Sequence, residues 1–250
     1  MRVPSFSWLF HPSSFIKEDD PMDGSTINFF SLTEEEREKL IGYYKRIGVF
    51  KKESVEKVFE NVYFLDVKGE KSPGYLVPPY VRNKFLAFPA RPLEWVLKEE
   101  AGGRGTTVGV AESCSGGLIA SRITDVPGSS QYFNGGVVAY SNVIKMKILG
   151  VDEEMIRSHG AVSSPVAIEM AKGASRVTGG RVCLSVTGVA GPEGGTKMKP
   201  VGTVWFGLHT PSGTTSISKR FKGTREEIKF QTSSHALFLL IEAVREGGEN

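Results

Sequence analysis

The segment TVGVAESCSGGLIASRI, residues 107–123, sets the fold class of this 250-residue chain. Residues 107–111 predict a short buried strand, the glycines at 116 and 117 predict a turn, and residues 117–123 predict a helix. In α/β folds, functional groups at the carboxyl end of such a strand face the crevice in which ligands bind. The segment therefore places Ser113 and Cys114 at a candidate site.

Strand and helix signals continue to alternate through residues 91–250. We expect helices at 93–100, at 153–159, from 164 to the glycines at 179 and 180, and from 224 onward, and strands at 136–140, 182–186, 201–208 and 215–221. This alternation predicts a three-layer α/β/α sandwich. The last two strands are joined across Pro211-Ser212-Gly213 and read as a hairpin, so the sheet should be mixed.

The composition changes near residue 90, because most aromatic residues precede it and most glycines follow it. We therefore place a boundary near residues 88–92 and expect two regions, 1–90 and 91–250. The first is a small aromatic-rich region of unknown role, which we interpret as helical and irregular. It contains a capping box at Thr33 and Glu36, a possible second helix at 54–59 and a strand at 62–67.

Composition and charge exclude several classes of function. The net charge of +3 is too balanced for nucleic acid as the main partner. The two cysteines, Cys114 and Cys183, form no disulfide framework, and a reducing cytoplasm is the simplest location. The histidines at 159, 209 and 235 lack metal-ligand spacing, so we expect no metal. No apolar run approaches the roughly 20 residues that cross a bilayer, so we expect no membrane association.

Ser113 and Cys114 are alternative nucleophiles, because neighbouring side chains of an extended segment point to opposite faces. No histidine lies near Cys114 in the sequence, which favours Ser113 and leaves Cys114 as a packing thiol, although a distant histidine is not excluded. The amides of Ser115, Gly116 and Gly117 could bind a phosphate or a developing oxyanion. A tight turn of small residues, needed only for packing, explains them equally well.

Lys145 is a candidate general base at the end of GGVVAYSNVIK, residues 135–145. Burial penalises the ammonium form of lysine, and a neutral amine can take a proton from serine. On composition alone an exposed lysine is the more frequent case. Tyr140 could relay a proton or hold the base in place, or it could be an ordinary aromatic residue at the end of a strand.

A second glycine-rich loop, SVTGVAGPEGGT at residues 185–196, follows another expected strand. It matches neither nucleotide-binding order, G-x-x-x-x-G-K-[ST] or G-x-G-x-x-G. Thr187 and Gly188 are candidate substrate contacts here, and a flexible turn is the alternative. Arg225 opens the last expected helix, where it could bind a phosphate with two hydrogen bonds or remain a solvated surface residue.

These motifs resemble the C-terminal domain of the CinA family, which is also found alone as a nicotinamide-nucleotide amidase. The matching pieces occur in family order and cover about residues 91–245. They are residues 111–117, 125–130, 135–145, 149–151, 159–163, 187–195 and 199–205.

The resemblance implies hydrolysis of the carboxamide of nicotinamide mononucleotide to nicotinate mononucleotide and ammonia, with no cofactor. It implies that Ser113 is the nucleophile, that Lys145 is its base and that Tyr140 supplies a supporting hydroxyl. It places Thr187 and Arg225 in segments that contact the substrate. It also implies a homo-oligomer.

The chain departs from the family pattern at three places. Ser115 stands where the family usually has threonine, and Lys229-Phe230-Gln231 replaces a stretch that typically carries arginine. Residues 1–90 do not resemble the molybdopterin-binding-like domain of longer CinA proteins. Two alternatives to the amidase therefore remain: a non-catalytic nucleotide-binding or scaffold protein, and an amidase for a different carboxamide.

Overall fold

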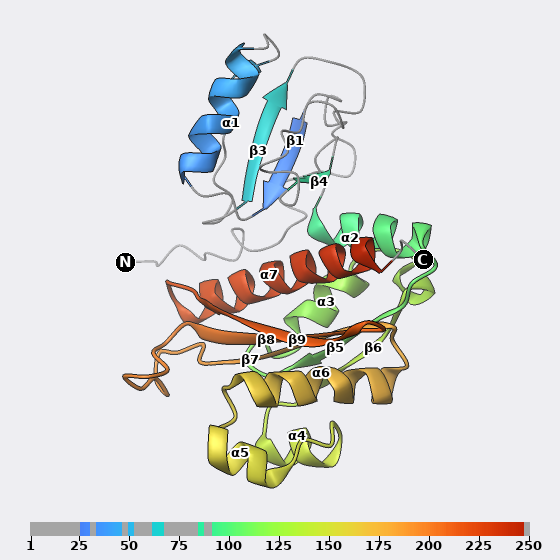
Figure 1. Ribbon diagram of the computed structural model, residues 1–250, viewed down its shortest axis with the longest axis vertical. Coiled ribbons are helices and arrows are strands. Elements are labelled where there is room, and N and C mark those ends of the chain that lie inside the picture. Colours follow the sequence, from blue (N-terminus) through green and yellow to red (C-terminus); the bar gives the residue numbers. More distant parts are fainter. Residues whose placement is uncertain are drawn as a thin grey trace, which may run out of the picture. The chain divides into compact units, whose positions relative to one another are not determined.

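The computed structural model describes residues 26–30, 34–46, 50–52, 62–67, 85–87 and 92–247 (Figure 1). The chain divides into two units, Met1–Pro92 and Leu93–Asn250. Each unit contains its own β-sheet. None of the helices in the described ranges is long and apolar enough to cross a membrane.

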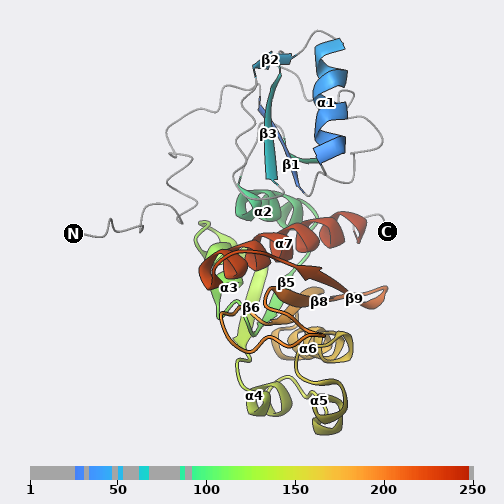
Figure 2. The ribbon, with the colours of Figure 1, turned by 90° about the vertical axis from the view of Figure 1, so that its left-hand side faces the viewer.

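The N-terminal unit contains an antiparallel sheet with the strand order β2-β3-β1-β4. Its elements are β1 (Thr26–Phe30), α1 (Glu34–Arg46), β2 (Phe50–Lys52), β3 (Val62–Val67) and β4 (Phe85–Ala87). Helix α1 flanks this sheet in Figures 1 and 2, and its Leu40 is buried.

The sheet corrects our interpretation of this unit as helical and irregular. The helix after Thr33 and the strand at 62–67 are present as α1 and β3. Strands β1, β2 and β4 were not predicted, because runs of three to five residues are too short to establish an alternating pattern. The expected helix at 54–59 lies outside the described residues.

The C-terminal unit alternates strands and helices as the sequence predicts. Its elements are α2 (Leu93–Gly103), β5 (Val108–Glu112), α3 (Leu118–Thr124), a short 3-10 helix (Ser129–Gln131), β6 (Phe133–Val138), α4 (Asn142–Lys147), α5 (Glu153–His159), α6 (Ser164–Thr178), β7 (Val182–Gly188), β8 (Thr203–Thr210), β9 (Gly213–Arg220) and α7 (Arg225–Glu246). Thr224 and Glu227 form the expected capping box at the start of α7.

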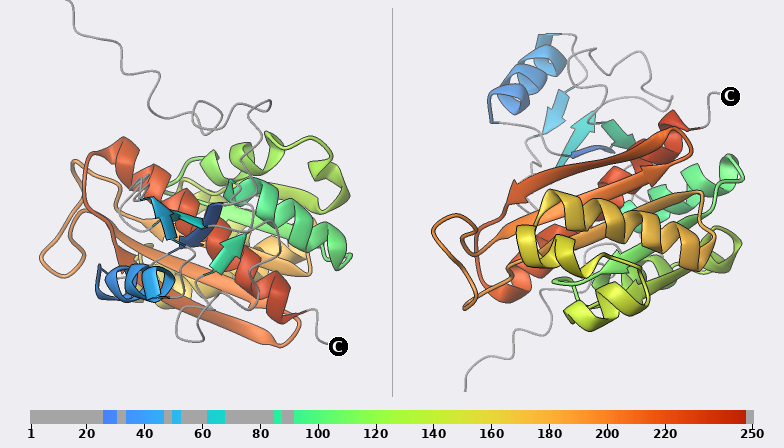
Figure 3. Two further views of the ribbon diagram at one scale, coloured as in Figure 1. Left: turned by 90° about the horizontal axis from the view of Figure 1, so that it is seen from above. Right: turned by 60° about the horizontal axis from the view of Figure 1, so that its bottom comes forward.

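The five strands of this unit form one mixed sheet with the order β6-β5-β7-β8-β9. Strand β5 is parallel to both β6 and β7, whereas β8 is antiparallel to β7 and to β9. Helices α2, α3 and α7 lie on one face of the sheet, and α6, with α4 and α5 beyond it, lies on the other (Figure 1). The right-hand view of Figure 3 shows α6 in front of the sheet and α7 behind it. The prediction of a three-layer α/β/α sandwich with a mixed sheet is confirmed.

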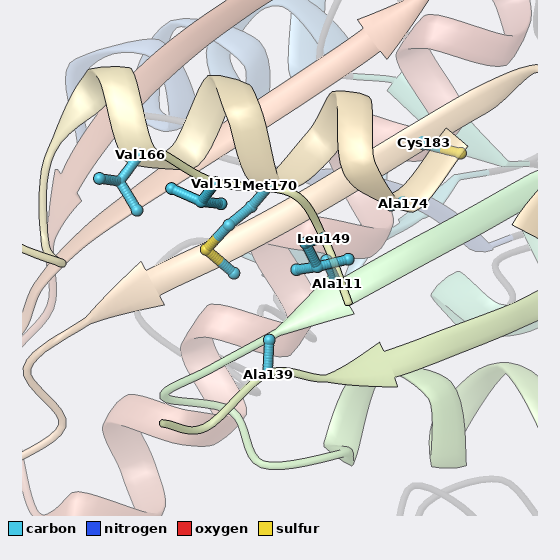
Figure 4. Close-up of a cluster of buried hydrophobic side chains, with 8 residues drawn as sticks. All are labelled: Ala111, Ala139, Leu149, Val151, Val166, Met170, Ala174 and Cys183. Carbon is cyan, nitrogen blue, oxygen red and sulfur yellow. The ribbon is translucent and has the colours of Figure 1, made fainter. Parts of the chain in front are cut away.

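A cluster of apolar side chains between α6 and the sheet forms part of the core (Figure 4). Helix α6 contributes Val166, Met170 and Ala174, which recur at helical spacing and are fully buried. They pack in one cluster with Ala111 on β5 and Ala139 just after β6. This packing fixes the ends of β5 and β6 relative to each other, and both ends carry residues of the candidate site.

Candidate active site

At the carboxyl end of β5 the strand order of the sheet changes direction. From β5 the chain passes through α3 to β6 on one side, and then through α6 on the opposite face to β7 on the other side. Ligand crevices of open α/β sheets form at such switch points. Ser113 follows the last residue of β5, and its amide donates to the carbonyl oxygen of Val186 on β7 at 3.0 Å.

Lys145 reaches this point from α4, a helix that the sequence analysis did not predict. The side chain of Ser141 caps α4 by accepting a hydrogen bond from the amide of Ile144. The Lys145 side chain is buried, and its Nζ lies 3.0 Å from Ser113 Oγ. The same Nζ lies 2.7 Å from the carbonyl oxygen of Ala139 and 3.4 Å from that of Tyr140.

Burial lowers the pKa of Lys145, and the nearby Cys114 opposes this shift only in part. No carboxylate forms a salt bridge with Lys145 among the described residues. A neutral amine has two N–H bonds and one lone pair, so it can donate to the two carbonyl oxygens and accept the Ser113 hydroxyl proton. The arrangement can therefore hold a deprotonated base against an alcohol.

Cys114 is a poor candidate for the nucleophile. Both candidates line the cavity and are similarly buried, but burial raises the pKa of the Cys114 thiol to about 12. Because the thiolate is the reactive form of cysteine, this thiol is inert near neutral pH. Of the two adjacent candidates, Ser113 is the one that contacts a possible base.

The turn after Ser113 differs from our expectation for the amides of Gly116 and Gly117. The Gly116 amide donates to the carbonyl oxygen of Ser113 at 3.1 Å, and the Gly117 amide donates to the Glu112 carboxylate at 3.0 Å. The Ser115 hydroxyl also donates to Glu112, at 2.7 Å, and its side chain is buried. These groups are already bonded within the protein, so they are unavailable to a phosphate or an oxyanion.

Glu112 is a site residue that sequence reasoning missed. Its carboxylate is buried and accepts the amides of Ile119 and Ala120 in addition to the donors in the turn. A carboxylate is stabilised at a helix N-terminus by the free amides and the helix dipole. The sequence signal for Glu112 was an acidic residue at the end of a buried strand, six positions before the first residue of α3.

Tyr140 and Arg225 contact each other at the rim of the site. The Arg225 guanidinium donates to the Tyr140 hydroxyl at 3.0 Å and to the carbonyl oxygen of Gly191 at 2.8 Å. The Tyr140 side chain is 61% exposed, and it is its backbone carbonyl that lies near Lys145. The hydroxyl is therefore placed to hold Arg225, rather than Lys145 as expected.

A cavity of about 220 Å³ opens over Ser113 and Lys145. Tyr140, Arg225, Thr187 and Gly188 also line it, whereas Ser115, Gly116 and Gly117 do not. Thr187 comes from β7 and donates its hydroxyl hydrogen to the carbonyl oxygen of Ala161, which leaves its oxygen lone pairs as acceptors. Asn142, on the first turn of α4, is a lining residue that the sequence analysis did not single out.

No group of three or more histidine, cysteine, aspartate or glutamate side chains within the described ranges could hold a metal ion. The polar groups that line the cavity are hydroxyl, amine, amide and guanidinium groups, together with the Cys114 thiol. Such groups suit an uncharged or anionic organic ligand better than a cation.

Fold and site together define an α/β protein with a buried serine–lysine pair at the switch point of its sheet. A family model described as the CinA C-terminal domain matches residues 91–244. The chain therefore belongs to the CinA C-terminal domain family, as its motifs indicate.

Curated relatives carry the same family name. A CinA-like protein from Desulfotalea psychrophila is 53% identical over 137 residues, which are 55% of this chain and 33% of that protein. A CinA-like protein from Geotalea uraniireducens is 50% identical over 133 residues, which are 53% of this chain and 32% of that protein. The chain thus spans about a third of the length of these relatives.

Solved structures of the family share the fold. A competence/damage inducible protein from Agrobacterium tumefaciens is 37% identical, with a TM-score of 0.59 over 61% of this chain and 93% of that chain. A CinA superfamily protein from Klebsiella pneumoniae is 30% identical, with a TM-score of 0.60 over 62% of this chain and 96% of that chain. Both comparisons cover nearly all of the known protein and leave over a third of this chain unmatched.

Proposed function

We propose that this protein is a serine–lysine amidase that hydrolyses the carboxamide of nicotinamide mononucleotide to nicotinate mononucleotide and ammonia. The observation that carries the proposal is the 3.0 Å separation of Ser113 Oγ and Lys145 Nζ in a buried setting. Membership of the CinA C-terminal domain family supports it further.

In the first half of the reaction, neutral Lys145 removes the hydroxyl proton of Ser113 as Oγ attacks the carboxamide carbon. The negative charge that develops on the carboxamide oxygen needs hydrogen-bond donors. Within residues 92–247, the amides of Cys114 and Ser115 donate to no oxygen and face only the Cys114 sulfur, a weak acceptor, which makes them the candidate donors beside Ser113. Protonated Lys145 then gives its proton to the leaving nitrogen, and ammonia departs from an acyl-enzyme.

In the second half, water takes the position of the departed ammonia. Lys145 removes a proton from this water, whose oxygen attacks the ester carbon of the acyl-enzyme. The bond to Ser113 Oγ breaks, and Lys145 returns the proton to that oxygen. The acid product leaves, and the serine and the neutral amine are restored.

One cation that lines the cavity and a second one beside the turn after Ser113 support a phosphate-bearing substrate. Arg225 lines the cavity, with its guanidinium held by Gly191 and Tyr140. A Cβ added to Gly116 would lie 3.6 Å from Lys229 Nζ, so this amine lies beside the turn that follows Ser113. We propose that Arg225 and Lys229 share the contact with the phosphate.

Ammonia release from nicotinamide mononucleotide, measured for the wild type and for Ser113→Ala, tests the proposal. Ser158→Ala is the matched control, because Ser158 is an exposed serine on α5. We expect the wild type and the control to release ammonia and Ser113→Ala to release none above background. Equal rates for the wild type and Ser113→Ala would overturn the proposal. Ligand binding without turnover would favour the nucleotide-binding or scaffold alternative.

The third candidate, an amidase for a different carboxamide, is favoured by one observation. Lys229 occupies a stretch in which the family typically has arginine. A lysine ammonium contacts a phosphate as a point charge, whereas the planar guanidinium of arginine can form two parallel hydrogen bonds with it. A panel of carboxamides with and without a ribose phosphate separates the two amidases. A higher kcat/KM for a carboxamide without a phosphate would favour the different substrate.

A further inference from the structure

We propose that Glu112 is the positioning residue of this site: its buried carboxylate holds the turn that carries Ser113. The proposal rests on the proposed function and adds to it a residue that does not touch the substrate. One carboxylate oxygen accepts from Ser115 Oγ at 2.7 Å and from the amides of Gly117 and Ile119 at 3.0 and 3.1 Å. The other oxygen accepts from the amide of Ala120 at 2.8 Å.

These donors are all neutral, and they all follow Ser113 in the chain. No salt bridge to Glu112 is present in residues 92–247. A buried carboxylate without a cation depends on its hydrogen bonds, and such bonds are stronger than those between neutral groups. The carboxylate therefore ties the start of α3 back to the end of β5, with Ser113 in the loop between them.

The backbone of Glu112 extends this connection to the base. Its carbonyl oxygen accepts the amide of Ala139 at 2.7 Å, and the Ala139 carbonyl oxygen accepts Lys145 Nζ at 2.7 Å. One residue thus links the segment that carries the nucleophile to the segment that holds the base.

The carboxylate also determines which amides remain for the reaction. It occupies the amides of Gly117, Ile119 and Ala120 at the start of α3, so these three are not available to an anionic ligand. Cys114 and Ser115, the two residues after Ser113, keep amides that donate to no oxygen in the described part of the chain. These two amides face the Cys114 sulfur, a weak acceptor that a developing oxyanion can replace.

An electrostatic role for Glu112 makes a different prediction. If its charge tuned the base, its removal would move the pKa of Lys145. Burial and Cys114 are the causes of the Lys145 shift, and Glu112 is not among them. A positioning role therefore predicts a lower rate with an unchanged pH midpoint.

Glu112→Gln tests the proposal, because it keeps the shape of the side chain and replaces one acceptor oxygen with an NH₂ donor. Whichever way the amide is oriented, at least one of the four donors loses its acceptor. Glu94→Gln is the matched control, since Glu94 is also buried and pairs with Arg122 outside the cavity. Ser115→Ala removes a single donor and provides a milder variant if Glu112→Gln folds poorly.

We expect kcat to fall roughly 10- to 100-fold in Glu112→Gln, with KM changed less than about threefold, because small misplacements of reacting groups cost rates of this order. We expect a smaller fall in Ser115→Ala and an unchanged kcat in Glu94→Gln. Equal losses of kcat in Glu112→Gln and Glu94→Gln would overturn the proposal. A shifted pH midpoint with an unchanged maximal rate would overturn it in favour of electrostatic tuning.

Two further measurements separate failure of this proposal from failure of the proposed function. A fluorophosphonate reacts with an activated serine, whose Oγ bonds to phosphorus as fluoride leaves and Lys145 takes the proton. The rate of this reaction at Ser113, followed by intact mass, should fall at least tenfold in Glu112→Gln even if no carboxamide is hydrolysed. A crystal structure of Glu112→Gln should show Ser113 Oγ and Lys145 Nζ beyond hydrogen-bond distance. An unchanged separation would overturn the proposal whatever the activity.

Discussion

Lys145 Nζ lies 3.0 Å from Ser113 Oγ, although 32 positions separate the two residues in the chain. Ser113 follows β5 and Lys145 is on α4, after the neighbouring parallel strand β6. Adjacent parallel strands end at the same edge of a sheet, so the segments after them meet there. This contact is the basis of the proposed chemistry.

Lys145→Arg tests whether the amine acts as a base. Arginine keeps a positive charge but cannot be deprotonated in a protein, so it cannot take the Ser113 proton. We expect kcat for carboxamide hydrolysis to fall by about 100-fold or more, within the range for loss of a general base. Ammonia release measures the effect. An active Lys145→Arg enzyme would show that the site needs only a cation.

The pH dependence of hydrolysis should report the neutral form of Lys145. Burial lowers the pKa of this amine below its ordinary value of 10.5, so the neutral fraction rises with pH at lower values than for an exposed lysine. We therefore expect kcat to rise with pH and to reach a plateau below pH 10.5. A rate that falls as the pH rises through this range would contradict the assignment.

Lys145 should also make stability depend on pH. Between its lowered folded pKa and 10.5, the unfolded state holds a proton that the folded state has lost, so stability rises with pH in this window. The contribution is fully present above 10.5 and is lost as the pH falls through the folded pKa. Urea unfolding at several pH values, with Lys145→Met as the reference, should show a difference in unfolding free energy that grows in favour of the wild type as pH rises.

Cys114 should remain unmodified in the folded protein. Burial raises the pKa of its thiol to about 12, so almost no thiolate exists at pH 8. We expect iodoacetamide to leave Cys114 unlabelled for hours at this pH and to label it after unfolding in urea, as measured by mass spectrometry. Rapid labelling of the native protein would reopen the choice between Cys114 and Ser113.

Tyr140→Phe distinguishes the two roles considered for the tyrosine. If its hydroxyl relayed protons, the variant would lose about 10²–10⁴ in kcat. Because the hydroxyl accepts from Arg225, whereas the backbone carbonyl lies near Lys145, we expect kcat to fall less than about tenfold and KM to rise. Steady-state kinetics with Arg225→Ala as a companion should show the same increase in KM.

Much of the C-terminal fold could be predicted from the sequence, because its elements carry local signals. The apolar stripe on α6 follows helical spacing, and the mixed sheet follows from the Pro211-Ser212-Gly213 connection between β8 and β9. Strand β6 starts three residues before the expected residue 136 because Phe133-Asn134-Gly135 has little apolar pattern. Helix α4 was missed because six residues are too few to establish a helical period.

The candidate site was predictable in its residue types but only partly in its geometry. Ser113 and Lys145 were singled out by their motifs, yet the sequence alone favoured an exposed Lys145. Its burial depends on distant segments, because its Nζ lies against Ser113 after β5 and the carbonyl oxygen of Ala139 after β6. Glu112 was missed because its role depends on amides five to eight residues away, which converge only when α3 folds back over β5.

By itself, the sequence determined the alternation of strands and helices, the mixed sheet and the family, because these depend on local periodicity, turn residues and ordered motifs. Tertiary structure decided three other points: that Lys145 is buried beside Ser113, that Glu112 occupies the amides at the start of α3, and that Tyr140 holds Arg225. The physical reason is that burial and hydrogen-bond partners arise from segments distant in the chain, and these meet only when the sheet has formed.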